Sequence, residues 1–154
     1  RPPRSTLFPY TTLFRSYQQY EISNFSVPNF ESKHNLKYWN LDEYIGIGPS
    51  AHSLFRGKRF YYKSSLNDFI EHSDVFEEGE FEPEIEYIML RMRLIEGLNS
   101  EKFEKKFGKN IPKIYFKRAE KYSKTGFLTY DENGIRLTKK GFLLSNTVIG
   151  EILG

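Results

Sequence analysis

The chain of 154 residues contains no cysteine, and only one tryptophan, two methionines and three histidines. Without thiols it cannot form disulfides, bind zinc through cysteine or hold an iron–sulfur cluster by itself. It also lacks any apolar run near the roughly 20 residues that a membrane-spanning helix requires. The N-terminus lacks the charged, apolar and small-residue regions of a secretory signal, so we expect a cytoplasmic protein.

Aromatic residues, by contrast, are abundant, at 17% with 14 Phe and 11 Tyr. This much bulky apolar surface can build a core, so disorder over the whole length is not expected. The net charge of +3 hides an asymmetry, because residues 17–97 hold 8 Lys and Arg against 14 Asp and Glu, and residues 98–154 hold 12 against 6. This split indicates two units with different surfaces.

Residues 1–16 differ in character from the rest. Thr6-Leu7-Phe8 recurs as Thr12-Leu13-Phe14 among prolines, with neither a helical nor a strand period. Such a segment resembles translated adapter or vector sequence, which is left out of fold reasoning. We therefore expect the native sequence to begin near Tyr17, with its natural N-terminal part missing, and deletion of residues 1–16 to leave thermal stability unchanged. A short irregular arm is the alternative.

Short strands and one helix are expected in the first half. The pattern predicts a strand end at 20–25, a loop or helical turn at 30–39, and a strand at 44–48 that runs into a glycine-rich turn. A tight turn at Gly57 and Lys58 is expected to lead into a returning strand at 60–62.

A helix capped by Ser65 is expected next, with Leu66, Phe69 and Ile70 on one face. The acidic stretch 77–84, which Gly79 and Pro83 interrupt, is the expected boundary between the two units.

The second half predicts three helices, a β-hairpin and a last helix. The helices are expected at 84–96, at 99–108 and at 112–124, the hairpin at 127–138 with Asn133-Gly134 at its turn, and the last helix from Thr138 onward. This order is typical of winged-helix domains. The residues expected to face the core are Ile85, Ile88, Met89, Met92, Ile95, Phe103, Phe107, Ile114, Tyr115, Ala119, Phe142, Leu143, Val148, Ile149 and Ile152.

The winged-helix pattern also raises the hypothesis of nucleic-acid binding. The basic residues available for it are Lys113, Lys117, Arg118, Lys121, Lys124 and Arg136. Most are lysines, which suit phosphates rather than base edges, and Asp131 and Glu132 at the hairpin tip would repel a phosphate backbone. Because fold does not fix function, we rank this hypothesis third and expect no nucleic acid among the partners.

The most informative stretch is His34-Asn35-Leu36-Lys37-Tyr38-Trp39, which places an imidazole, a phenol and the single tryptophan close together. Downstream, Gly46 and Gly48 lie in a turn that reaches Ala51. An imidazole beside flat aromatic rings suits a planar metallated ligand or a nucleotide-like cofactor. On these residues alone, a structural histidine and an ordinary core tryptophan remain open, and the two glycines lack the third of a dinucleotide fingerprint.

Several motifs in order resemble one family. They are Tyr20-Glu21-Ile22-Ser23-Asn24-Phe25, His34-Asn35-x-x-Tyr38-Trp39, Tyr44-x-Gly46-x-Gly48-Pro49-x-Ala51-His52-Ser53, Met89-Leu90-x-x-Arg93-Leu94-x-Glu96-Gly97 and Leu137-Thr138-x-x-Gly141-x-x-Leu144-Ser145-Asn146. Together they resemble the HemW-type heme chaperones, radical S-adenosylmethionine proteins related to oxygen-independent coproporphyrinogen III oxidase. The resemblance covers essentially residues 17–154, as a C-terminal fragment.

The resemblance implies an α+β fold in three parts. Residues 17–63 would be the last strands and loops of a partial (β/α) radical S-adenosylmethionine barrel. Residues 64–80 would be a helix and linker, and residues 81–154 a mostly helical, winged-helix-like C-terminal domain of the HemN type. Asn29 and Ser50 stand where the family usually has glycine; Asn tolerates a left-handed backbone, and Ser50 leaves the conformation of its turn open.

The resemblance also implies the site. Heme would bind at the motif that contains His34, Asn35, Tyr38 and Trp39, with His34 as the candidate iron ligand. The turn that contains Gly46, Gly48 and Ala51 would lie near S-adenosylmethionine and contact it through backbone groups.

The intact protein would carry a [4Fe–4S] cluster, but its three cysteine ligands are absent here, so this chain alone should be inactive in radical chemistry. The implied partners are heme and heme-accepting proteins, with peripheral membrane association through the acceptors left open. The implied function is delivery of heme to acceptor proteins. The alternative is an oxygen-independent coproporphyrinogen III oxidase, and the His-Asn-x-x-Tyr-Trp motif favours the chaperone.

Overall fold

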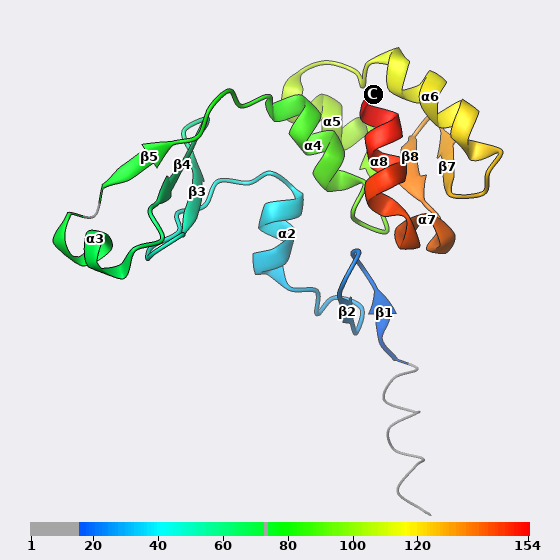
Figure 1. The fold of residues 1–154 in the computed structure, drawn as a ribbon. Helices are drawn as coiled ribbons and strands as arrows, with labels where there is room; N and C mark the ends of the chain where they lie inside the picture. Colours follow the sequence, from blue (N-terminus) through cyan, green and yellow to red (C-terminus); the bar gives the residue numbers. More distant parts are fainter. Residues whose placement is uncertain (1–15, 73) are drawn as a thin grey trace, which may run out of the picture.

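The computed structural model describes residues 16–72 and 74–154, so the expectations for the first sixteen residues lie outside the described part except at Ser16. Helices and short antiparallel strands alternate along the chain, which confirms a mixed α and β composition. Figure 1 shows a small sheet with one helix at one end, a helical unit with a second sheet at the other, and a short helix and a two-stranded ribbon between them.

The ribbon consists of β1 (Gln18–Gln19) and β2 (Phe25–Ser26), paired antiparallel. Its connecting loop pairs with the segment that follows helix α4 (Pro83–Arg91), because Ile22 N donates to Arg93 O (2.9 Å) and Ile95 N donates to Tyr20 O (3.1 Å). The N-terminal motif is therefore joined through its backbone to the C-terminal half.

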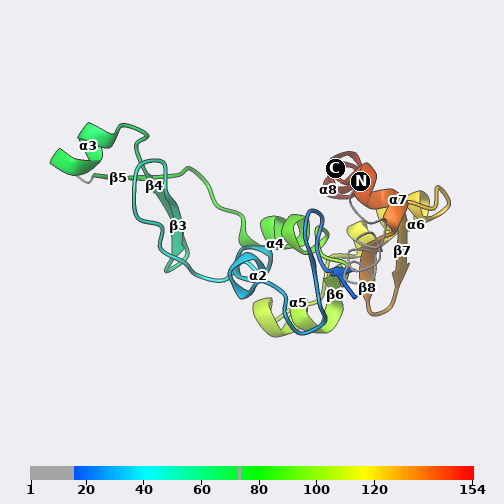
Figure 2. The ribbon, with the colours of Figure 1, turned by 90° about the horizontal axis from the view of Figure 1, so that it is seen from below.

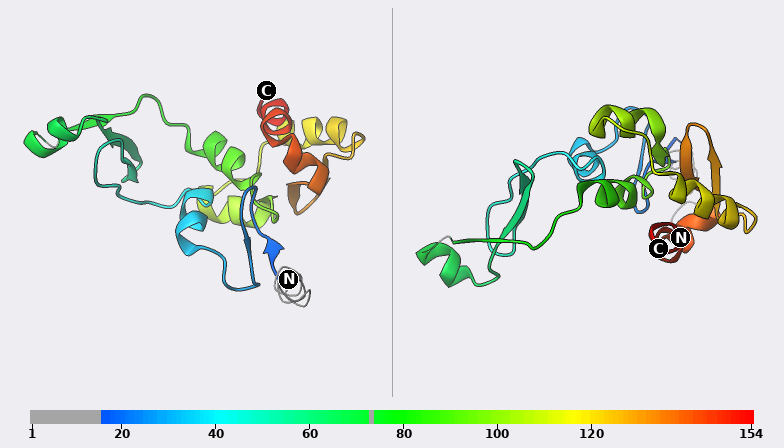
Figure 3. Two further views of the ribbon diagram at one scale, coloured as in Figure 1. Left: turned by 60° about the horizontal axis from the view of Figure 1, so that its bottom comes forward. Right: turned by 90° about the horizontal axis from the view of Figure 1, so that it is seen from above.

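The small sheet has the order β3-β4-β5, with β3 (His52–Phe55), β4 (Lys58–Tyr62) and β5 (Val75–Glu77) all antiparallel. Arg56 and Gly57 form the β3–β4 turn, one position before the predicted Gly57 and Lys58, with φ of 51° and 72°, the left-handed pair that two-residue hairpins prefer. Ser65 caps α3 (Leu66–Glu71) as predicted, by accepting from Asp68 N. Figure 3 shows that this sheet and α3 extend away from the helical unit.

The helical unit follows. It contains α4, β6 (Leu98–Asn99), α5 (Ser100–Phe107), α6 (Lys113–Ser123), β7 (Leu128–Asp131), β8 (Gly134–Leu137), α7 (Lys139–Leu143) and α8 (Ser145–Leu153). The strands form a sheet in the order β6-β8-β7, and α8 packs on α4 and α6. The predicted second and third helices and the hairpin are confirmed. Asn99 caps α5 by accepting from Lys102 N, and Gly108 ends it at φ 69°.

The core lies mainly in this unit. Its fully buried apolar side chains, each at most 3% exposed, include Ile88, Met92, Leu98, Phe103, Ala119, Leu128, Ile135, Val148, Ile149 and Ile152. The expectation of inward positions was wrong for Ile114 and Leu143, which are 48% and 85% exposed, and for Ile85 and Ile95, which are each 38% exposed. Leu41 and Leu54 join the same core from the first half of the chain, so the two halves share apolar packing.

Three predicted boundaries were also wrong. Helix α4 ends at Arg91 rather than at residue 96, because the backbone of residues 93–95 pairs with the ribbon loop. The strand at 44–48 reduces to a single bridge between Tyr44 and Leu54. The last helix divides at Leu144, where φ −121° and ψ 25° leave the helical region and redirect α8.

Candidate functional site

The predicted heme motif forms a helix, α2 (Lys33–Trp39), which lies beside α4 (Figure 2). Ser32 caps it by accepting from Asn35 N (3.3 Å), which satisfies one of the free amides of the first turn. Side chains four positions apart share a face of such a helix. His34 and Tyr38 therefore lie together, on a side where His34 is exposed to solvent.

His34, Tyr38 and Tyr44 form one aromatic cluster. The Tyr38 hydroxyl lies 3.1 Å from His34 Nε2, and the two rings meet edge to face with centroids 4.9 Å apart. The Tyr44 ring meets the other side of Tyr38 edge to face, at 4.6 Å. Burial raises the pKa of Tyr44 above its ordinary value in spite of the nearby Arg59 guanidinium, so its phenol is neutral at neutral pH.

Asn35 and Trp39, the other two predicted heme residues, are also four positions apart and share the neighbouring face of the helix, about 100° round from His34 and Tyr38. Asn35 Nδ2 donates a long hydrogen bond of 3.5 Å to the Tyr20 hydroxyl, toward the β1–β2 ribbon. Trp39 is partly buried, and its indole Nε1 is a buried donor without a partner among the described residues. A buried unpaired donor is uncommon and is a position where a ligand can supply an acceptor.

The C-terminal end of α2 is held by charged side chains of the helical unit. Arg91, only 2% exposed, donates to Asn40 Oδ1 and to Glu96 Oε2, and Lys102 also pairs with Glu96. Lys106 Nζ donates to Leu41 O (3.0 Å). Partial burial acts to raise the pKa of Glu96, but hydrogen bonds and charge from Lys102 and Arg91 lower it below its ordinary value.

Arg91 was missed by sequence reasoning although a signal existed. It lies three residues after Ile88, on the stripe of α4 that faces the core, where a charged side chain needs a buried partner. Asn40 as that partner is set only by the tertiary structure, because the two residues are 51 positions apart.

The turn predicted to lie near S-adenosylmethionine follows Tyr44. The Gly46 amide donates to Ser53 Oγ (3.0 Å), and a Cβ at Gly46 would lie 2.4 Å from His52 O, so a larger residue does not fit. The Ala51 amide donates to Gly48 O (3.0 Å). The amides of Gly46 and Ala51 are thus engaged inside the turn, which leaves fewer backbone donors for a cofactor than expected.

Asn29 and Ser50, which stand where glycine was expected, adopt the backbone conformation that glycine favours. Asn29 has φ 71° and Ser50 has φ 60°. Both therefore occupy the left-handed region without glycine, at a modest cost in backbone energy.

The residues present fit heme better than they fit a cluster. Exposed His34 offers an imidazole, and iron ligation through Nε2 requires the Tyr38 hydroxyl to leave that nitrogen. The chain has no cysteine, and residues 16–72 and 74–154 contain no group of three or more metal-ligating His, Cys, Asp or Glu side chains.

Within residues 16–72 and 74–154 no helix is both long and apolar enough to cross a membrane.

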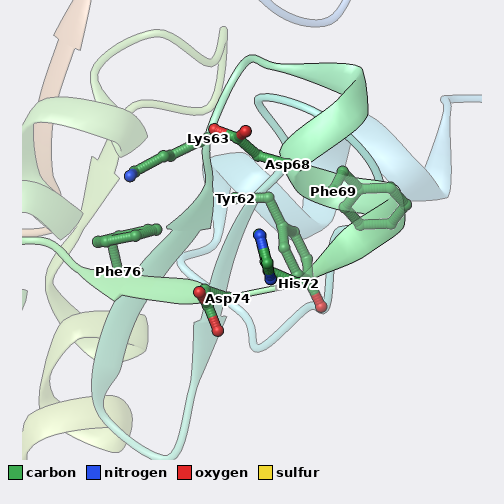
Figure 4. Close-up of a pocket in the computed structure, with 7 residues that line it drawn as sticks. All are labelled: Tyr62, Lys63, Asp68, Phe69, His72, Asp74 and Phe76. Carbon is green, nitrogen blue, oxygen red and sulfur yellow. The ribbon is translucent and has the colours of Figure 1, made fainter.

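A cavity of about 190 Å³ lies elsewhere, between β4, α3 and β5 (Figure 4). It is lined by Tyr62, Lys63, Asp68, Phe69, His72, Asp74 and Phe76. The Lys63 ammonium lies 4.6 Å from the centroid of the Phe76 ring. None of the residues predicted to bind heme or S-adenosylmethionine lines this cavity.

Comparison with known proteins agrees with the motifs. Residues 85–144 match the family model of the HemN C-terminal domain. The chain is 33% identical over 145 residues to the heme chaperone HemW of Lactococcus lactis and 31% identical over 144 residues to that of Bacillus subtilis. It is also 31% identical over 169 residues to the mitochondrial radical S-adenosyl methionine domain-containing protein 1 of Dictyostelium discoideum. These matches confirm the resemblance to HemW-type heme chaperones.

The matches cover most of this chain but less than half of each relative. They span 89% of the chain and 38% of the L. lactis protein, and 88% of the chain and 38% of the B. subtilis protein. Among solved structures, coproporphyrinogen III oxidase (HemN) of Escherichia coli, a radical SAM enzyme, superposes with a TM-score of 0.62 at 16% identity. That match covers 94% of this chain and 39% of the HemN chain, and it shows a shared fold.

Proposed function

We propose that this chain carries the heme-binding part of a heme chaperone. The observation that carries the proposal is helix α2, which presents His34 to solvent with Tyr38 on the same face and the unpaired Trp39 indole on the neighbouring face. His34 is the proposed iron ligand, and Asn35, Tyr38 and Trp39 shape the porphyrin site. Heme bound there would supply the iron; the chain supplies the imidazole, the aromatic surface and the hydrogen-bonding groups.

The relatives named as heme chaperones support this proposal and extend it to the whole protein. We propose that the whole protein delivers heme to acceptor proteins in the cytoplasm, with peripheral membrane contact only through the acceptors. It would use S-adenosylmethionine near Gly46, Gly48 and Ala51, and a [4Fe–4S] cluster whose ligands lie outside this chain. Residues 17–63 would close a (β/α) barrel, residues 64–80 would link it onward, and residues 81–154 would form a winged-helix-like domain.

The likeness to HemN favours a second candidate, an oxygen-independent coproporphyrinogen III oxidase. The two candidates differ at α2, because an exposed imidazole is a ligand for heme iron and has no such role toward a metal-free porphyrinogen. Heme binding that depends on His34 therefore separates them.

The test is titration of the 154-residue chain with hemin, followed by the Soret absorption band. His34→Ala should lose the axial-ligand spectrum and bind at least about tenfold more weakly, which corresponds to about 1.4 kcal/mol. His72→Ala, a surface histidine outside α2, is the matched control and should leave both unchanged. An unchanged spectrum and affinity in His34→Ala would remove His34 from the site.

A further inference from the structure

Basic side chains in the acidic first part of the chain are nearly all engaged. Residues 17–97 contain eight Lys and Arg, and six have a partner among the described residues. Those six are Lys58 with Glu77, Arg59 with Glu86, Arg91 with Glu96, Arg93 with Asn146, Arg56 over the Phe55 ring and Lys63 over the Phe76 ring. The two without one, within the described part, are Lys33 and Lys37.

Both free lysines lie on α2, the helix that carries His34. An α-helix turns by about 100° per residue, so Lys37 lies about 60° and Lys33 about 100° from His34, on the same flank. Asn35 and Tyr38 lie on the opposite flank. The structure agrees, because Lys33, His34 and Lys37 are exposed while Asn35 and Tyr38 are partly covered.

Stabilisation of helix α2 does not account for the presence of a lysine at position 33. Lys33 occupies the first position of α2, where a positive charge interacts unfavourably with the helix dipole, and the first turn contains no acidic residue to offset it. The acidic side chains close in sequence do not neutralise the lysines. Glu31 accepts from the backbone amide of Asn29, and Asp42 pairs with Lys106 at 3.7 Å.

We infer that Lys33 and Lys37 bind the carboxylates of the porphyrin whose iron His34 ligates, an inference that rests on the proposed function. Heme carries its two propionates along one edge of the ring. Heme ligated by His34 with that edge turned over the lysine flank would let each ammonium pair with one carboxylate. The ligand class of this face is therefore a porphyrin dicarboxylate, selected by charge as well as by its metal.

The experiment uses three probes with the 154-residue chain: hemin, hemin dimethyl ester, which lacks free carboxylates, and metal-free protoporphyrin IX, which lacks iron. The test variant is Lys33→Gln/Lys37→Gln. The matched control is Lys113→Gln/Lys117→Gln on α6, an exposed pair at the same spacing and without partners among the described residues. Circular dichroism and thermal melting verify that all proteins are folded alike.

The lysine variant should bind hemin and protoporphyrin IX about three- to twentyfold more weakly than wild type, and the control should not. Wild type should bind hemin dimethyl ester with the same low affinity that the lysine variant has for hemin. The lysine variant should bind the ester no more weakly than wild type binds it, because the ester has no free carboxylate for the lysines to pair with. Higher salt should weaken hemin binding by wild type more than by the variant.

Equal hemin affinity in the lysine variant and wild type would overturn the inference, as would an equal loss for hemin and its dimethyl ester. If the lysine variant binds hemin more weakly while His34→Ala leaves the hemin spectrum unchanged, the lysine inference stands and the proposed iron ligand fails. If wild type binds none of the three probes, both fail.

Discussion

The hydroxyl oxygen of Tyr38 lies 3.1 Å from Nε2 of His34, one helical turn earlier on α2. The nitrogen that an iron atom would use is thus already occupied by a hydrogen bond. Ligation through Nε2 requires this bond to break, so the bond competes with heme.

We expect Tyr38→Phe to bind hemin about two- to fivefold more tightly than wild type, because one hydrogen bond in a partly exposed site contributes roughly 0.5–1 kcal/mol. Hemin titration measures the change. Tyr61→Phe is the control, since its ring stacks on His52 in the distant β-sheet. Weaker hemin binding by Tyr38→Phe would mean that the hydroxyl contacts the ligand and does not compete with it.

Arg91 should contribute strongly to stability. Arg91→Met leaves Asn40 without its donor and Glu96 with Lys102 as its remaining partner, so we expect the free energy of unfolding to fall by about 1–3 kcal/mol. Arg93→Met removes only a more exposed hydrogen bond to Asn146 and should cost less than about 1 kcal/mol. Urea denaturation of both variants measures this difference, and equal losses would contradict the role of Arg91.

Glu96 should make part of the stability depend on pH. Burial acts to raise its pKa, but Lys102 and Arg91 lower it below the ordinary value. A carboxylate with a lowered pKa in the folded state adds stability above its unfolded pKa, and this is lost as pH falls through the folded pKa. Wild type should therefore exceed Glu96→Gln in stability at pH 6–7, by less than about 1 kcal/mol since the carboxylate is partly exposed.

The difference should shrink as pH falls below about 4.3, the unfolded value. Urea unfolding at a series of pH values measures it, with Glu101→Gln as a control that lacks an ion pair among the described residues. A difference that stays constant down to pH 3 would contradict the assignment.

Two glycines in consecutive helices should respond oppositely to alanine. A Cβ at Gly141 in α7 would lie 1.9 Å from Phe127 O, so Gly141→Ala should cost more than about 2 kcal/mol. A Cβ at Gly150 in α8 meets nothing within 4 Å, and Gly150→Ala should stabilise by about 0.5–1 kcal/mol through helix propensity. Thermal melting compares the two, and a similar effect at both positions would refute the close packing of Gly141.

Local sequence was sufficient where local interactions dominate. Asn99 and Gly108 bound α5 and Ser65 caps α3, both as predicted. The predicted hairpin also forms, but Glu132 and Asn133 make its turn, one position before the predicted Asn133-Gly134. Each of these features depends on hydrogen bonds or backbone angles within a few residues, so neighbouring side chains decide them. The motif around His34 is local in the same sense, because its members share one helix.

Long-range contacts decided the rest. Helix α4 stops at Arg91 because residues 93–95 pair with the β1–β2 loop about seventy positions earlier, which no helical period records. The anchoring of α2 by Arg91 and Lys106 likewise joins residues far apart in the chain. The residue types and their spacing specify a helix with an imidazole and two lysines on its outer side. Apart from Arg56, which lies over the neighbouring Phe55 ring, the other basic side chains of residues 17–97 find their partners only in the tertiary structure, because these contacts join residues that folding brings together. The same structure leaves Lys33 and Lys37 free among the described residues.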